Sequence, residues 1–185
     1  MIARIALIGL SGAGKTTVAP LLAERLGFAW DDLDEVIERS AGSTVGELIE
    51  ERGEAAFREM EGAALRDLLG DDEPTGGLVL ACGAGVPTRE ENRLLLRRTA
   101  FTVWLSITPR AAARRLEGGQ TARRPLLLRG GTVEARLSAL LAQRRSLYDA
   151  VADATIETDR RTPAQVAEAI EGLGKGRRGW APSGS

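Results

Sequence analysis

The feature that most constrains the fold is a glycine-rich loop near the start of the chain. Residues 9–16, GLSGAGKT, fit the pattern GxxxxGK[ST]. An apolar run at 3–8 precedes the loop and predicts a buried parallel strand. Apolar residues then recur at helical spacing from 16 to 26, and Gly27 supplies a stop. A strand, this loop and a helix in succession predict an anion cradle, formed by backbone N–H groups and the positive end of the helix.

The side chains of this loop suggest a nucleoside triphosphate, and we expect ATP with Mg²⁺. Lys15 would reach the β- and γ-phosphates, and the Thr16 hydroxyl would ligate the metal ion. A glycine turn with an incidental lysine is the alternative, and the flanking strand and helix argue against it. The other residues expected to complete the phosphate contacts are Gly12, Ala13, Gly14 and Thr17.

The rest of the chain alternates between short apolar runs and segments of helical periodicity. The further strands are predicted at 28–30, 78–81, 101–107 and 154–157. Helices are predicted over 35–69, from Thr88, from Thr108, over 133–151 and from Thr162. Within 35–69, a capping box of Thr44 and Glu47 is expected to start one helix and Gly53 to end it. Strands alternating with helices predict an α/β fold with five parallel strands and helices on both faces of the sheet.

Length and spacing predict one domain. The 185 residues are enough for one substantial core, and we place a single domain at 1–173. Within it, the glycine- and arginine-rich stretch at about 118–131 is interpreted as a mobile lid. The polar residues 174–185 lack a core pattern and are interpreted as a disordered tail.

Composition excludes several kinds of chemistry. The 25 basic residues nearly cancel the 26 acidic ones, which argues against nucleic acid as a partner. The chain has no histidine, so histidine-based triads and His-ligated zinc are excluded. A single cysteine, Cys82, excludes an internal disulfide and fits a cytoplasmic location. No apolar run approaches the ~20 residues of a membrane span, so we expect no membrane association.

Two carboxylates follow the second predicted strand. Asp32 and Asp34 are two residues apart, and in an extended chain they would point the same way. One could hold a water of the Mg²⁺ shell while the other orients an attacking hydroxyl. Alternatively, Asp31, Asp32 and Asp34 are an acidic N-cap cluster for the next helix. Spacing alone leaves both interpretations open.

Six segments in series resemble the signatures of the shikimate kinase family. They are GLSGAGKTT, DDLDEVIE, GEAAFREME, ACGAGVPTREENR, RRPLL and QRRSLYDAVAD, and together they extend over nearly all of residues 1–172. The resemblance implies a P-loop NTPase fold of three layers, α/β/α, like that of nucleoside monophosphate kinases. It also implies a monomeric enzyme that transfers the γ-phosphate of ATP to the 3-hydroxyl of shikimate.

The resemblance further implies roles for individual residues. Asp32 would lie near the metal ion through water, and Asp34 would position or deprotonate the attacking hydroxyl. Arg58 and Arg144 would hold the substrate carboxylate, for which a planar guanidinium is well suited. Arg124 would belong to the lid over the ATP phosphates. The loop Gly83, Ala84 and Gly85 would contact the substrate.

One residue departs from the pattern, since the family usually has three consecutive glycines where this chain has Ala84. If that position needed a positive φ or very close approach, affinity would fall, and we expect the alanine to be harmless. Cys82 is interpreted as a packed strand residue, and Trp30 either as core or as a wall of the acceptor pocket. The competing functions are a kinase for gluconate, a nucleoside or another small metabolite, and a nucleotide-binding regulatory protein without turnover.

Overall fold

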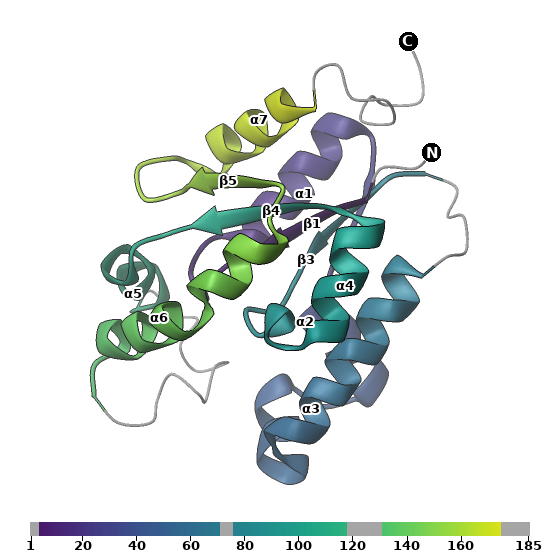
Figure 1. Ribbon diagram of the computed structural model, residues 1–185, viewed down its shortest axis with the longest axis vertical. Helices are drawn as coiled ribbons and strands as arrows, with labels where there is room; N and C mark the ends of the chain where they lie inside the picture. Colours follow the sequence, from purple (N-terminus) through teal and green to yellow (C-terminus); the bar gives the residue numbers. More distant parts are fainter. Residues whose placement is uncertain (1–3, 71–75, 118–130, 175–185) are drawn as a thin grey trace.

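The computed structural model describes residues 4–70, 76–117 and 131–174, and a parallel sheet forms its centre (Figure 1). The five strands lie in the order β2-β3-β1-β4-β5, and all neighbours are parallel. Their bounds are β1 (Arg4–Ile8), β2 (Ala29–Asp32), β3 (Leu78–Ala81), β4 (Phe101–Ser106) and β5 (Ala154–Glu157). The predicted five-stranded parallel sheet is therefore confirmed.

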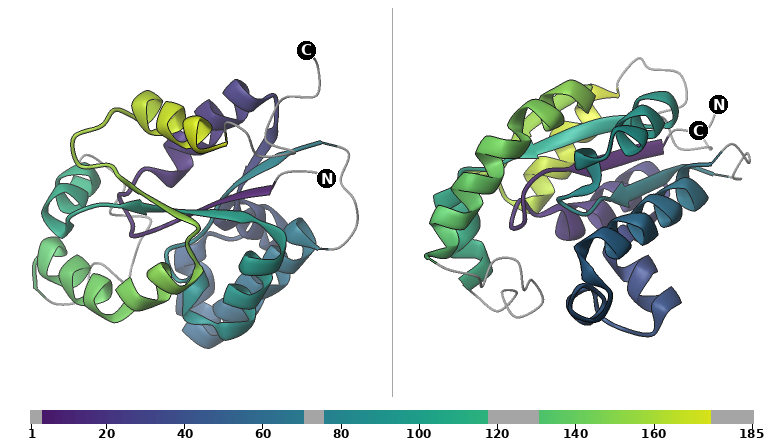
Figure 2. Two further views of the ribbon diagram at one scale, coloured as in Figure 1. Left: turned by 45° about the horizontal axis from the view of Figure 1, so that its top comes forward. Right: turned by 60° about the horizontal axis from the view of Figure 1, so that its bottom comes forward.

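Helices cover both faces of this sheet. Their bounds are α1 (Lys15–Leu26), α2 (Leu33–Ala41), α3 (Val45–Leu69), α4 (Glu90–Thr99), α5 (Pro109–Glu117), α6 (Val133–Val151) and α7 (Pro163–Leu173), with a 3₁₀ turn η1 at Val86–Thr88. In Figure 2, α1 and α7 lie on one side of the sheet, and α3 and α4 lie on the other. The predicted three layers are present.

The core divides into two clusters because strand residues point alternately to the two faces. On β1, Ile5 and Leu7 belong to the cluster under α1 and α7, whereas Ala6 and Ile8 belong to the cluster under α2, α3 and α4. The three central strands, β1, β3 and β4, are buried on both faces, as parallel strands usually are. The two layers hold the carboxyl ends of the strands at one edge, where ligands of such sheets bind.

Most of the predicted boundaries are confirmed. The strands 78–81 and 154–157 and the helix 133–151 have the predicted bounds. The capping box of Thr44 and Glu47 is formed, and Gly53 breaks α3 with φ 84° and ψ 160°. These signals are local, so sequence alone reveals them.

Three predictions are corrected. Thr88 does not cap α4: it ends η1 and its hydroxyl donates to the Gly85 carbonyl at 2.6 Å, while α4 begins at Glu90 without a side-chain cap. The second strand begins at Ala29 and continues through Asp32. Trp30 is 40% exposed on this edge strand, so of its two interpretations the core one is wrong and the acceptor-pocket one stays a prediction.

The predicted lid and tail lie outside the described residues, except at their borders. Within the described ranges, none of the helices combines the length and apolar character needed to cross a membrane.

Candidate active site

The glycine loop joins the carboxyl end of β1 to the first turn of α1. Gly14 is the N-cap of α1 and has a left-handed backbone, with φ 94°. A β-carbon on Gly12 would lie 2.8 Å from the Ala112 carbonyl oxygen, so the loop packs against α5 with no space for a side chain there. The backbone of the loop therefore lies at the positive end of α1, as an anion cradle requires.

Lys15 is buried and lies across this loop. Its ammonium donates to the carbonyl oxygens of Gly9 at 2.9 Å and Leu10 at 3.0 Å. The side chain thus places a positive charge at the cradle, next to the start of α1. This is the charge that the sequence pattern predicts for a phosphate group.

Thr16 and Asp32 meet from adjacent elements. The Thr16 hydroxyl donates to Asp32 Oδ2 at 2.6 Å, and Asp32 is buried at the end of β2. No cluster of three or more His, Cys, Asp or Glu that could hold a metal ion exists in the described residues. One hydroxyl and one carboxylate suit Mg²⁺, which protein sites often bind with one or two carboxylates, waters and substrate phosphates. The pair therefore fits the expected cofactor.

The extended geometry predicted for Asp32 and Asp34 is wrong, because Asp34 lies in the first turn of α2. Asp32 is the N-cap of this helix, and its Oδ1 accepts from the Asp34 backbone N–H at 3.0 Å. The N-cap alternative is thus confirmed for Asp32. The capping carboxylate uses Oδ1 for the helix and Oδ2 for Thr16, so capping and a place beside the phosphate loop are compatible.

The Asp34 carboxylate lies against the loop after β3. A β-carbon on Gly83 would lie 2.9 Å from Asp34 Oδ1 and 2.6 Å from Glu61 Oε1. Gly83 has no positive φ, so its glycine is required by space rather than by backbone conformation. Two carboxylates from α2 and α3 therefore converge on one α-carbon.

Arg58 of α3 is held by two glutamates. Its Nη1 lies 3.0 Å from both oxygens of Glu61, and its Nη2 lies 3.1 Å from Glu54 Oε1. The Glu61 side chain is only 1% exposed, whereas that of Glu54 is 50% exposed. A β-carbon on Gly85 would overlap the Arg58 guanidinium, so this group lies directly on the loop after β3.

Burial and charge act in opposite directions on this pair. Burial lowers the pKa of Arg58, but Glu61 and Glu54 outweigh it, and the pKa is raised overall. For Glu61, burial raises the pKa above its ordinary value, against the opposing charge of Arg58. The guanidinium is charged, and the carboxyl is harder to ionise than an exposed glutamate.

Two residues of α6 contact the same loop after β3. Arg144 Nη1 donates to the Ala84 carbonyl oxygen at 3.2 Å, and the Tyr148 hydroxyl donates to the same oxygen at 2.8 Å. Burial raises the pKa of Tyr148, while the charges of Arg144 and Arg58 lower it and that of Glu61 raises it. The Tyr148 hydroxyl therefore lies within the electrostatic reach of both arginines and of Glu61.

Ala84 itself is accommodated without backbone strain. No described residue other than glycine has a positive φ, so the alanine adopts an ordinary backbone conformation. The loop Gly83, Ala84 and Gly85 needs glycine at its two ends for space, and the middle position tolerates a methyl group. The condition of a positive φ, under which affinity would fall, is therefore absent at Ala84, and the harmless interpretation of the alanine stays a prediction.

The predicted nucleotide and acceptor residues lie at the same edge of the sheet. In the register, Leu7 lies beside Ala81, and Ala81 lies beside Asp32, so the loops after β1, β3 and β2 are neighbours. The buried Cys82 lies between them: burial raises the pKa of its thiol, and the charges of Lys15, Glu61, Asp32 and Asp34 all act on it. Cys82 is a packed residue, as expected. Arg124 lies outside the described residues.

The sequence interpretation missed three polar residues: Glu61, Tyr148 and Arg115. Glu61 falls on the buried stripe of α3, between Phe57 and Leu65 at intervals of four, where a carboxylate is unexpected. This position of a carboxylate on the apolar spacing of the helix is the sequence signal that could have revealed Glu61. Arg115 of α5 donates to the carbonyls of Gly12 and Thr158, so it ties the phosphate loop to the segment after β5. Tyr148 and Arg115 both bond to backbone carbonyls distant in sequence, and no motif indicates such contacts.

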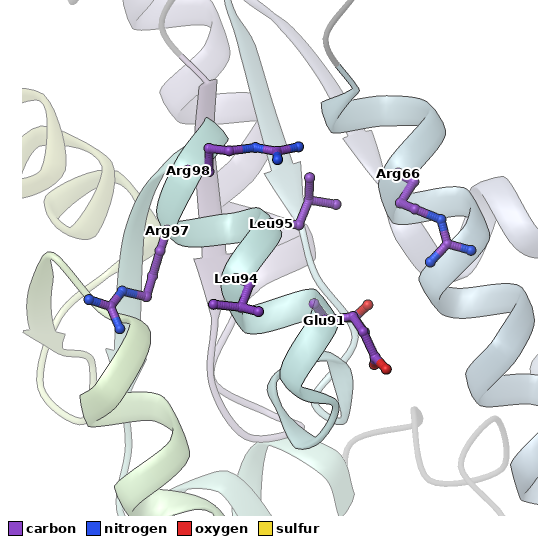
Figure 3. A pocket seen from close by; sticks show the side chains of 7 residues that line it. Arg66, Glu91, Leu94, Leu95, Arg97 and Arg98 are labelled. Atoms are coloured by element: carbon purple, nitrogen blue, oxygen red, sulfur yellow. The ribbon is translucent and has the colours of Figure 1, made fainter.

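A surface pocket between α3 and α4 does not belong to this edge of the sheet (Figure 3). It is lined by Arg66 of α3 and by residues of α4, among them Leu94, Arg97 and Arg98. Arg97 and Arg98 point in different directions, so these cations do not converge on one ligand.

The sheet order, the glycine loop before α1 and the buried lysine across that loop define a P-loop NTPase. Comparisons with known proteins identify the family. The family model described as shikimate kinase matches residues 11–172, and the chain belongs to the shikimate kinase family.

Named relatives agree with this assignment. A shikimate kinase of Symbiobacterium thermophilum is 43% identical over 178 residues, which cover 95% of this chain and 99% of that protein. One of Parasynechococcus marenigrum is 42% identical, over 89% of this chain and 82% of its own. Among solved structures, the shikimate kinase of Acinetobacter baumannii in complex with shikimate has a TM-score of 0.88, at 35% identity and 96% coverage of both chains.

Proposed function

We propose that this protein phosphorylates shikimate, using ATP with Mg²⁺. Membership of the shikimate kinase family supports the reaction, and similarity to a structure solved with shikimate supports the acceptor. The observation that carries the proposal for the site is the convergence of Asp34, Arg58 and Arg144 on the loop Gly83 to Gly85, beside the Lys15 cradle. A carboxylate and two guanidiniums next to a phosphate site suit a small acid that carries a hydroxyl.

In the proposed reaction, the γ-phosphoryl group passes from ATP to the 3-hydroxyl oxygen of shikimate. The P–O bond to the β-phosphate breaks as the new P–O bond forms, and ADP is released. Lys15 would neutralise charge on the transferred group, and Asp34 would orient the hydroxyl and accept its proton. Mg²⁺ held by Thr16 and, through water, by Asp32 would supply further neutralisation of the phosphate oxygens.

The two arginines would orient the acceptor. Arg58 from α3 and Arg144 from α6 contact the same loop from two different helices, so together they would fix the acid's carboxylate in one direction. Arg124 and the stretch 118–131 are proposed to close over the ATP phosphates and to exclude water. A monomer in the cytoplasm is proposed as the working state. The single cysteine fits a reducing compartment, and the monomer is carried over from the family resemblance.

The test is ADP release by the purified protein with ATP, Mg²⁺ and, in separate reactions, shikimate, gluconate or nucleosides. Shikimate-dependent release is the expected result. Release dependent on gluconate or a nucleoside would select the corresponding rival kinase instead. Nucleotide binding without acceptor-dependent turnover would indicate a regulatory protein.

A further inference from the structure

One backbone carbonyl in the acceptor loop accepts hydrogen bonds from two side chains of the same helix. The Ala84 carbonyl oxygen lies 2.8 Å from the Tyr148 hydroxyl and 3.2 Å from Arg144 Nη1. Positions 144 and 148 are one turn apart on α6, so their side chains lie on the same face. The two donors therefore share one acceptor.

Tyr148 is the firmer of these two donors. Its side chain is fully buried, and its ring packs against Trp104 of β4 with the ring centroids 5.6 Å apart. Arg144 is only partly buried, and its bond to Ala84 is the longer one. A buried aromatic ring loses little further freedom when its hydroxyl bonds, so it can hold a loop in place.

The peptide that Tyr148 holds also connects the two arginines. Its carbonyl, from Ala84, contacts Arg144, and its next residue, Gly85, lies directly under the Arg58 guanidinium. A planar trans peptide has no internal freedom, so fixing its carbonyl also fixes the adjoining α-carbon. The relative placement of both guanidiniums therefore depends on the direction of this carbonyl.

We propose that Tyr148 is a positioning residue of the acceptor site: its hydroxyl fixes the Ala84–Gly85 peptide and, through it, the spacing of the Arg144 and Arg58 guanidiniums. Without the hydroxyl, the Ala84 carbonyl keeps only Arg144 as a side-chain donor among the described residues. The guanidinium is then drawn toward the loop and away from the substrate carboxylate. The inference rests on the proposed function, because that function assigns both arginines to the substrate.

The test is Tyr148→Phe, which removes the hydroxyl and keeps the ring. We expect the KM for shikimate to rise about 5- to 20-fold, with kcat and the KM for ATP within about twofold of the parent protein. Titration calorimetry should show the same fold-change in the Kd for shikimate. The control is Val151→Ala, which removes buried packing at the end of the same helix but leaves the Tyr148 hydroxyl and its ring contact with Trp104, and should lower the melting temperature without raising the KM for shikimate.

A double-mutant cycle with Arg144→Lys adds an independent measurement. Because Tyr148 and Arg144 share the Ala84 carbonyl, their effects on the KM for shikimate should not multiply. Independent effects would overturn the inference. So would an unchanged KM in Tyr148→Phe, or an equal loss in every kinetic constant, which a general structural role would produce. If the parent protein showed no turnover of shikimate, the proposed function would fail instead, so the two failures are distinguishable.

Discussion

Replacing Glu61 with glutamine should weaken shikimate binding more than it weakens the fold. Both oxygens of Glu61 accept from Arg58 Nη1 at 3.0 Å, and the side chain is 1% exposed. Glutamine keeps one acceptor and the volume, but it removes the charge that fixes the guanidinium. Arg58 retains Glu54 as a partner, and that partner is half exposed.

The magnitude follows from these contacts. Removing one member of a buried ion pair costs about 3 to 5 kcal/mol, because the remaining charge is left unpaired. Arg58 keeps Glu54, and the raised pKa of Glu61 shows that burying the ionised carboxylate is itself unfavourable, so the two effects offset and we expect a change of less than about 1 kcal/mol in the free energy of unfolding. An unanchored Arg58 should raise the KM for shikimate about tenfold or more.

Two assays separate these effects. Chemical denaturation gives the free energy of unfolding, and shikimate-dependent ADP release gives the KM. Glu54→Gln is the matched control, since it removes the exposed partner of the same guanidinium, and it should be close to the parent protein in both assays. A KM for shikimate within twofold of the parent in Glu61→Gln would refute the reasoning, because Arg58 would then not depend on Glu61 for its place in the site.

The same residue predicts a pH dependence. Burial raises the pKa of Glu61 above the ordinary value of 4.5, so the folded state favours the protonated carboxyl. Its contribution to stability is therefore fully present below pH 4.5 and is lost as the pH rises through the raised pKa. Shikimate affinity should change in the opposite sense, because only the ionised carboxylate orients Arg58. In Glu61→Gln, the free energy of unfolding and the shikimate affinity should both vary less with pH between 4.5 and the raised pKa. A variant with the same pH profiles as the parent would show that another group causes the pH dependence.

The remaining predictions concern the phosphate and acceptor loops. Asp34→Asn should reduce kcat about 100-fold or more and leave the Kd for ATP nearly intact, and unchanged turnover would remove Asp34 from the reaction. Asp32→Asn should raise the Mg²⁺ concentration needed for half-maximal rate and, because amide and carboxylate oxygens both cap helices, should change the melting temperature little. Gly85→Ala should displace the Arg58 guanidinium and raise the KM for shikimate about tenfold with little change for ATP; an equal effect on both substrates would contradict it.

Sequence predicts the parts of this protein that depend on local chemistry. The pattern around Lys15 and the capping residues Thr44 and Thr162 act within one turn of chain, and the structure forms them as expected. Thr88 matched a capping pattern as well, but its hydroxyl bonds the Gly85 carbonyl in η1, and a competing local bond of this kind is invisible in the pattern. Tyr148 depends on a carbonyl 64 residues away, so only the assembled fold reveals it.

Asp32 shows why two interpretations of one motif need not exclude each other. Its two oxygens are directed to different partners, the α2 backbone and the Thr16 hydroxyl. Capping therefore places a carboxylate where the phosphate loop ends. The same residue stabilises the start of α2 and forms part of the site. At Gly85, the absence of a side chain leaves the space that the Arg58 guanidinium occupies.

The presence of Glu61 has a physical cost that orientation of Arg58 explains. A carboxylate next to Arg58 and Asp34 reduces the positive charge available to an acidic substrate, and burying it is unfavourable, as its raised pKa indicates. A guanidinium without it could still attract an acid, but it could adopt many side-chain rotamers. Because γ-phosphoryl transfer depends on placing one hydroxyl in line with the phosphate, a fixed direction of the acid is worth more to the rate than one additional charge. The ion pair of Arg58 and Glu61 therefore lowers the attraction for the acid but fixes the direction of the guanidinium. For this reason, its loss should raise the KM for shikimate more than it lowers the free energy of unfolding.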